Sequence, residues 1–214
     1  ACAFSNKAGL FNIGCEGQLY IGALTATATA LAMQGLPRFL VILVSFLTGM
    51  MSGALVGGFN GLLKAKLNIN EVLVAIMLNY IMKFFASYCV HGPMKDPKSK
   101  VMQSPSIGQE YMLTKILPKS QLTTALILGL ILAALLYVFI NKTRAGFALR
   151  AVGENGSAAQ AAGISMVKTV IITMAASGAI AALTGVTEVF GKTGKFVDGF
   201  SPGYGFTGIA VAVL

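Results

Sequence analysis

The sequence predicts an all-α fold, a polytopic bundle of transmembrane helices with one broken helix and one short helix in a polar loop. Two runs carry the prediction, because residues 39–63 and 121–141 contain no charged side chain. Each run exceeds the roughly 20 residues that a helix needs to cross about 30 Å of hydrocarbon. The composition agrees: 56% of the residues are hydrophobic and 11% are charged, whereas soluble domains carry about 25% charged residues.

The apolar runs place the helices in order along the chain. Their expected bounds are 17–34, 39–63, 71–90, 121–141 and 166–186, with a final segment that starts near Gly203. The second helix carries glycine at every fourth position, which lets neighbouring helix backbones approach closely. This stripe consists of Gly49, Gly53, Gly57 and Gly61.

The chain shows no repeat of fixed period and no low-complexity linker, so we expect residues 1–214 to form a single transmembrane domain. The first residue is Ala1, no signal peptide follows it, and residues 205–214 are still apolar. We therefore expect an internal fragment of a longer chain.

Several functional classes find no support. The net charge is +9, but the cations are spread over the loops without interleaved aromatic residues, so we expect no nucleic-acid partner. The three cysteines form no metal-binding pair, and no catalytic constellation is present, so we expect no metal and no catalytic residue. Residues 191–193 read Gly-Lys-Thr but lack the upstream glycine of a phosphate-binding loop, so we expect no cofactor and no ATP on this chain.

The polar loop 142–165 predicts a short helix between two spans. Ser157 and Gln160 have the spacing of a capping box, and Gly163 supplies a stop. Four alanines between them favour a helix of one or two turns. The segment is either a docking helix or an ordinary solvated loop.

Glu16 is the acidic residue of the first apolar helix. Its charge suits the positive end of the helix dipole, and Asn12, Gly14 and Gly17 permit a non-helical break beside it. Transporters place such breaks beside the solute route. The alternative is an acid at the level of the lipid headgroups.

The helix over 71–90 carries its polar groups at every fourth residue, a face that should point into the bundle or a water-filled path. The face runs through Glu71, Ala75, Asn79, Lys83 and Ser87, of which all but Ala75 are polar. Lys83 either extends to the outer interface or lines a cavity. Asn60 either packs helices together or lies on the route.

Charge alone leaves the orientation open, because loop 91–120 and loop 142–165 are both basic.

Four segments, in this order, resemble the permease subunits of bacterial ATP-binding-cassette importers, in the simple-sugar and nucleoside branch related to ribose and branched-chain amino acid permeases. The segments are GLFNIGCEGQLYIGA (residues 9–23), NGLLKAKLNINEVLVAIMLNYI (60–81), KTRAGFALRAVGENGSAAQAAGIS (142–165) and GFTGIAVAVL (205–214).

The resemblance implies that loop 142–165 is cytoplasmic and that its short helix is the coupling helix, which docks on an ATPase subunit. The residues assigned to coupling are Arg144, Gly146, Arg150, Gly153, Glu154, Asn155, Ala158, Ala159 and Gly163.

The resemblance also implies transport of nucleosides or related sugar-containing solutes across the bacterial cytoplasmic membrane, with ATP hydrolysed on a partner. The implied partners are two ATP-binding subunits, a second permease chain that is identical or a sister subunit, and an extracytoplasmic solute-binding protein, lipid-anchored or not, on the outward loop 91–120. The expected solute route contains Asn12, Glu16, Asn60, Asn79, Tyr80 and Phe206. A monosaccharide permease and an ion-coupled secondary transporter remain the alternatives.

Overall fold

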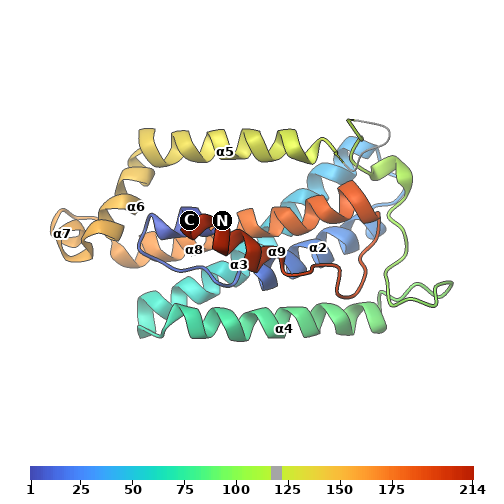
Figure 1. Cartoon of the computed structure of the whole chain (residues 1–214), viewed down its shortest axis with the longest axis horizontal. Coiled ribbons are helices and arrows are strands. Elements are labelled where there is room, and N and C mark those ends of the chain that lie inside the picture. Colours follow the sequence, from blue (N-terminus) through green and yellow to red (C-terminus); the bar gives the residue numbers. More distant parts are fainter. Residues whose placement is uncertain (117–121) are drawn as a thin grey trace.

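The computed structural model describes residues 1–116 and 122–214, and these ranges contain helices and two isolated β-bridges but no strand (Figure 1). The all-α expectation is confirmed. The elements are α1 (Cys2–Asn6), α2 (Cys15–Ala32), α3 (Arg38–Leu67), α4 (Glu71–His91), η1 (Gln109–Tyr111), α5 (Ala125–Lys142), α6 (Arg144–Glu154), α7 (Gly156–Ala161), α8 (Met166–Glu188), η2 (Val189–Thr193) and α9 (Tyr204–Val213).

Residues 117–121 lie outside the described residues. Lys119 of the outward loop and the first residue of the helix expected over 121–141 fall in this gap.

Four of the described helices are long and apolar enough to cross a membrane, which makes the chain a multi-pass membrane protein. They are α3, α4, α5 and the continuous stretch Met166–Thr193 formed by α8 and η2. Successive spans run in opposite directions, so the connecting segments gather at two ends of the molecule (Figure 1). The α6–α7 segment lies at one end, which we call the coupling end. Residues 92–116 and 194–198 lie at the other, which we call the loop end.

Helix α2 occupies the centre of the bundle, because 13 of its 18 residues are buried. It packs on α3 and α8, and the three helices approach at glycine. A Cβ atom on Gly22 would lie 2.5 Å from Ala182 Cβ, and one on Gly53 would lie 2.5 Å from the Gly178 carbonyl oxygen. Any larger side chain at these positions would force the helices apart, so the glycine stripe of α3 is a packing surface.

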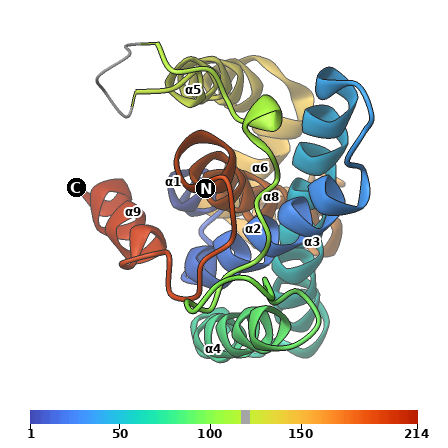
Figure 2. The ribbon, with the colours of Figure 1, turned by 90° about the vertical axis from the view of Figure 1, so that its right-hand side faces the viewer.

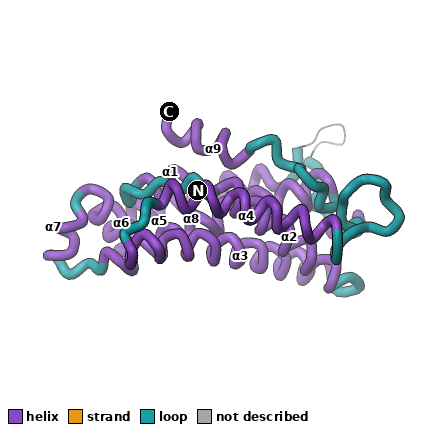
Figure 3. The backbone as a smooth tube through the Cα atoms, turned by 90° about the horizontal axis from the view of Figure 1, so that it is seen from below, coloured by secondary structure: helices purple, strands orange, loops and turns teal. Residues whose placement is uncertain are grey.

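The other helices lie at the periphery of this central group. Helix α4 packs along α2, whereas α5 stands off the bundle with none of its residues buried (Figure 2). Helix α9 lies along one side, near α1 and the first turn of α2 (Figure 3).

At the loop end, the two long connections are joined by backbone hydrogen bonds. Ser104 N–H donates to Phe196 O at 2.8 Å, and Leu113 N–H donates to Phe190 O at 2.8 Å. The phenyl ring of Phe196 packs edge-on to Tyr20 of α2. These contacts fix the segment that leads into α9 against the centre of the bundle.

Candidate functional site

The chain breaks between α1 and α2, where residues 7–14 are not helical. Asn12 is fully buried in this break and is bonded on both sides of its amide. Its Oδ1 accepts from Gly14 N–H at 3.0 Å, and its Nδ2 donates to Gln18 Oε1 at 2.9 Å and to Ser177 Oγ at 2.8 Å. Asn12 therefore shapes the break and ties it to α8.

Asn79 of α4 holds the same break from the opposite side. Its Oδ1 accepts from Gly17 N–H at 2.8 Å, and its Nδ2 donates to Ile13 O at 2.9 Å. The first N–H groups of a helix lack partners within that helix, so a side chain from α4 caps α2. A Cβ atom on Gly17 would lie 2.8 Å from Asn79 Cα, and glycine is what allows this approach.

Glu16 lies in the first turn of α2 and is 7% exposed. Its Oε1 accepts from the Ser201 hydroxyl at 2.6 Å, and its Oε2 accepts from Gly205 N–H at 2.7 Å. Ser201 Oγ in turn accepts from Tyr204 N–H at 3.1 Å at the start of α9. One carboxylate thus meets the positive ends of two helices, α2 and α9. Its burial argues against an acid exposed among lipid headgroups.

These groups border a cavity of about 500 Å³ between α4 and the start of α9. Four residues of the expected route line it: Glu16, Asn79, Tyr80 and Phe206. The complete lining is Ile13, Glu16, Ile76, Asn79, Tyr80, Lys83, Ser201, Pro202, Gly203 and Phe206. Tyr80 and Phe206 are 61% and 51% exposed as residues, and both line the cavity, which therefore offers aromatic surface beside a carboxylate and an amide.

The other two expected route residues lie elsewhere. Asn12 is enclosed in the break, and Asn60 donates its Nδ2 to Glu71 O at 3.2 Å, which ties α3 to the start of α4. Sequence reasoning also missed Ser201 as a cavity residue. The local signal was weak, because Ser201 lies three residues before α9, whose N-cap is Gly203.

The coupling segment contains two helices, where the sequence predicted one. Helix α6 precedes α7, and Asn155 separates them with extended backbone. The Asn155 side chain accepts from Ala158 N–H at 3.0 Å, so Asn155 is the N-cap of α7. The expected cap at Ser157 is wrong, because Ser157 already lies inside the helix.

The predicted stop at Gly163 is confirmed. Gly163 has φ of +83°, its N–H donates to Gln160 O at 3.0 Å, and Ile164 N–H donates to Ala159 O at 2.9 Å. These two bonds are those of the Schellman motif that ends many helices at glycine.

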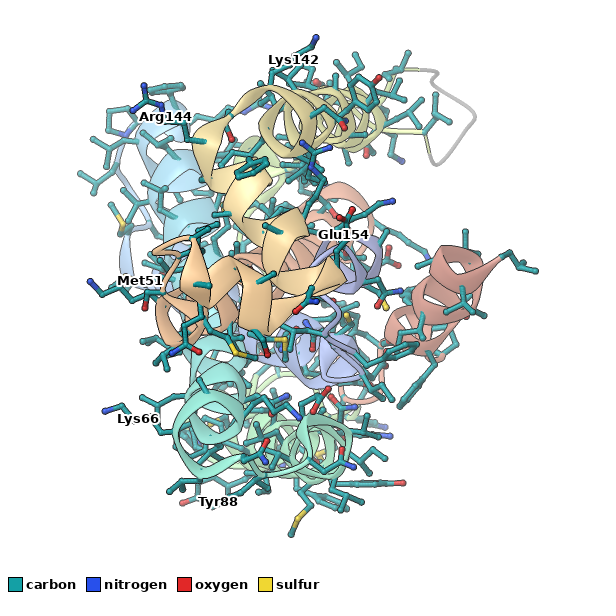
Figure 4. The ribbon with its side chains drawn as sticks, turned by 90° about the vertical axis from the view of Figure 1, so that its left-hand side faces the viewer. Met51, Lys66, Tyr88, Lys142, Arg144 and Glu154 are labelled. Atoms are coloured by element: carbon teal, nitrogen blue, oxygen red, sulfur yellow. The ribbon has the colours of Figure 1, made fainter. Side chains whose placement is uncertain are left out.

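The residues assigned to coupling divide into inner and outer positions. Gly146 and Ala159 are buried within the chain, whereas the side chains of Arg144, Glu154, Asn155 and Ala158 are exposed, as is Gly163; Arg150 and Gly153 are half-buried. Figure 4 shows Arg144 and Glu154 on α6 at this end, with Lys66 at the end of α3.

Two glycines of the segment lie against other parts of the chain. A Cβ atom on Gly146 would lie 2.5 Å from the Ile140 carbonyl oxygen of α5, and one on Gly153 would lie 2.9 Å from the Ala8 backbone. The end of α6 therefore touches the segment that leads into the broken helix.

Asn79→Leu should destabilise the protein by about 1–3 kcal/mol for each buried group left without a partner, because Gly17 N–H and Ile13 C=O lose their bonds. The thermal unfolding midpoint in detergent should fall. Asn141→Leu is the matched control, since Asn141 is exposed and its side chain donates to Tyr137 O of its own helix. Equal midpoints for the two variants would contradict the capping role.

Comparison with known proteins places the chain in a family. All of residues 1–214 match the family described as branched-chain amino acid transport system / permease component. The chain is 38% identical to the guanosine ABC transporter permease protein NupP of Bacillus subtilis, covering 100% of this chain and 62% of the relative.

Two further relatives have similar identity. The nucleoside ABC transporter permease protein NupB of Lactococcus lactis subsp. cremoris is 35% identical over 99% of this chain and 61% of its own length. The glucose ABC transporter permease protein TsgB13 of Haloferax volcanii is 34% identical over 97% of this chain and 57% of its own length. No solved structure matches the chain.

The chain thus spans about three fifths of the length of these relatives. The match over the whole chain agrees with the multi-pass helical architecture and with the four segments that suggested a permease. The chain belongs to the branched-chain amino acid transport system / permease component family.

Proposed function

We propose that this chain is part of the permease subunit of an ATP-driven importer that moves nucleosides or related sugar-containing solutes. The observation that carries the proposal is the cavity between α4 and α9, in which the Tyr80 and Phe206 rings lie beside the Glu16 carboxylate and the Asn79 amide. Its volume of about 500 Å³ falls within the range of about 300–1,000 Å³ for small-molecule sites.

The chemistry of this cavity suits a nucleoside. A nucleobase has a flat face that stacks on aromatic rings, and ribose carries hydroxyl groups that donate hydrogen bonds. Glu16 uses one acceptor position of each oxygen for Ser201 and Gly205, and a carboxylate has about four such positions. The relatives named for guanosine and nucleoside transport support the same solute class.

A monosaccharide is the second candidate, since one relative is named for glucose transport. A sugar would use the same polar groups but would leave much of the aromatic surface without a flat partner. The aromatic lining therefore favours the nucleoside.

ATP hydrolysis is assigned to a separate ATPase subunit, which docks on the exposed face of α6 and α7. Closure of that partner would move the coupling segment as a rigid body. The contact of Gly153 with the Ala8 backbone gives this movement a route to the break before α2, and hence to Glu16 and the cavity.

The proposed assembly also contains a second permease chain, identical or a sister subunit, in the bacterial cytoplasmic membrane. The extracytoplasmic solute-binding protein, lipid-anchored or not, would dock at the loop end, where residues 92–116 and 194–198 are held together by backbone bonds. This orientation makes the coupling end cytoplasmic.

The proposal is tested by labelled guanosine uptake into cells that express the complete transport system. Excess adenosine should compete, whereas excess ribose, glucose or a branched-chain amino acid should not. Depletion of ATP with the membrane potential intact should stop uptake. Inhibition of uptake by ribose or glucose but not by adenosine would show that nucleosides are not the solute class. Uptake that survives ATP depletion would favour an ion-coupled transporter.

Glu16→Gln should lower the maximum uptake rate by about tenfold. A neutral glutamine side chain cannot accept charge-assisted hydrogen bonds from both Ser201 and Gly205. A hydrogen bond to a charged group contributes about 1.5–3 kcal/mol. The wall formed by residues 201–206 then loses its hold on α2. Glu188→Gln is the control, because Glu188 pairs with Lys192 near the end of α8, away from the cavity. Unchanged uptake by well-expressed Glu16→Gln would remove Glu16 from the transport route.

Ala158→Arg should abolish uptake while leaving membrane insertion intact, because it places a long charged side chain on the exposed docking face of α7. Ala159 suits this test less well, since it is buried within the chain and a substitution there disturbs the segment itself. Ala158→Ser, which stays small, should retain uptake. Normal uptake by Ala158→Arg would show that the ATPase docks elsewhere.

A further inference from the structure

The polar face of α4 is almost completely used within the described part of the chain. Glu71 forms an ion pair with Lys64 at 2.9 Å, Asn79 caps α2, and Ser87 Oγ donates to Asp198 Oδ2 at 3.0 Å. Lys83 lies between Asn79 and Ser87 on this face. It lines the cavity, yet its ammonium group forms no ion pair or hydrogen bond with the residues that the structure describes.

The position of Lys83 along the helix is fixed by its neighbours on the face. Asn79 holds α4 to α2 one turn before it, and Ser87 holds α4 to residue 198 one turn after it. Lys83 lies eight residues before the last residue of α4, His91, which is about 12 Å along the axis. A lysine side chain does not span that distance, so Lys83, which is exposed and lines the cavity, does not reach the level of His91. A charged side chain within a span is a functional group by default.

The charges of the cavity define the solute that fits. Lys83 supplies a cation with donors only, and Glu16 on the α2 side supplies a carboxylate with acceptors only. The pair favours a neutral solute with an acceptor edge at one end and hydroxyl donors at the other. A phosphate would meet repulsion at Glu16. Tyr80 and Phe206 supply surface for a flat ring between the two ends.

We propose that Lys83 determines selectivity by donating to the O6 and N7 acceptors of a 6-oxopurine nucleoside, such as guanosine or inosine, with the ribose hydroxyls toward Glu16. Lysine recognises this pair of adjacent acceptors in guanine, whereas adenine presents an amino donor in place of O6. Lysine therefore favours the oxopurine over the aminopurine. This inference depends on the proposed nucleoside transport and names the class of nucleoside.

The test measures labelled guanosine and adenosine uptake in cells that express the complete system with the same binding protein throughout. The selectivity of the binding protein then cancels when the guanosine-to-adenosine ratio of a variant is divided by that of the wild type. Lys83→Met should lower this ratio by about fivefold or more while adenosine uptake continues. Lys83→Arg should keep the preference for guanosine. Lys192→Met should leave the ratio unchanged, because Lys192 is exposed and pairs with Glu188 away from the cavity.

A charge-rescue variant covers the case in which Lys83→Met transports poorly. Lys83→Cys treated with an aminoethyl thiol reagent should regain the guanosine preference, and a sulfonatoethyl reagent should not restore it. The chain with Lys83 intact is the control for reaction at Cys2, Cys15 and Cys89.

The outcomes separate the two proposals. Absence of uptake of any nucleoside by the wild type would refute the proposed function. Wild-type uptake with an unchanged ratio in Lys83→Met would overturn the selectivity inference alone. Equal loss of both nucleosides in Lys83→Met and Lys83→Cys, without charge-selective rescue, would assign Lys83 to structure. Inhibition of the wild type by guanosine monophosphate that is lost in Lys83→Met, with the ratio unchanged, would assign it to an anionic solute instead.

Discussion

A helix that begins inside an apolar bundle must find partners for its first N–H groups, and this constraint organises the molecule. Helix α2 begins at Cys15, within the buried centre, where water cannot satisfy the backbone at low cost. Asn79 bonds Gly17 N–H from α4, and the Glu16 carboxylate meets the N-termini of both α2 and α9. Asn79 and Glu16 also line the cavity, whereas Asn12, which shapes the same break, is enclosed.

Close contacts at glycine join the central helices to one another and the start of α9 to α2. Helices α2, α3 and α8 meet at glycine, where close backbone contact makes them a single rigid unit. Helix α9 is held at its start by Ser201 and Gly205, which bond one carboxylate. The start of α9 is also packed closely on α2, since a Cβ atom on Gly205 would lie 2.5 Å from Glu16 N.

The coupling segment is joined to the bundle on two sides. Gly146 lies against the last turn of α5, and Gly153 lies against the Ala8 backbone before the break. Helix α5 has no fully buried residue, but Leu136 and Ile140 pack on the cluster that contains Phe4. The contact at Gly153 instead meets the chain that Asn12 fixes to α8. Movement at the coupling end would thus reach the break before α2 more directly than it would reach α4.

The sequence by itself determined the long helices and their order, since apolar runs, glycine spacing and the Gly163 stop are local signals, but it did not predict α1 or separate α6 from α7. It also marked Glu16, Asn79, Tyr80 and Phe206, four residues that line one cavity. Only the tertiary structure decided their partners. Asn12 and Asn60 proved to hold the backbone, and Asn155 rather than Ser157 capped α7 because it adopts the extended conformation that a cap requires. Ser201 entered the site through a bond to a residue 185 positions away. Such pairings depend on how the helices pack. A local pattern in a single sequence does not show which residues far apart along the chain come into contact.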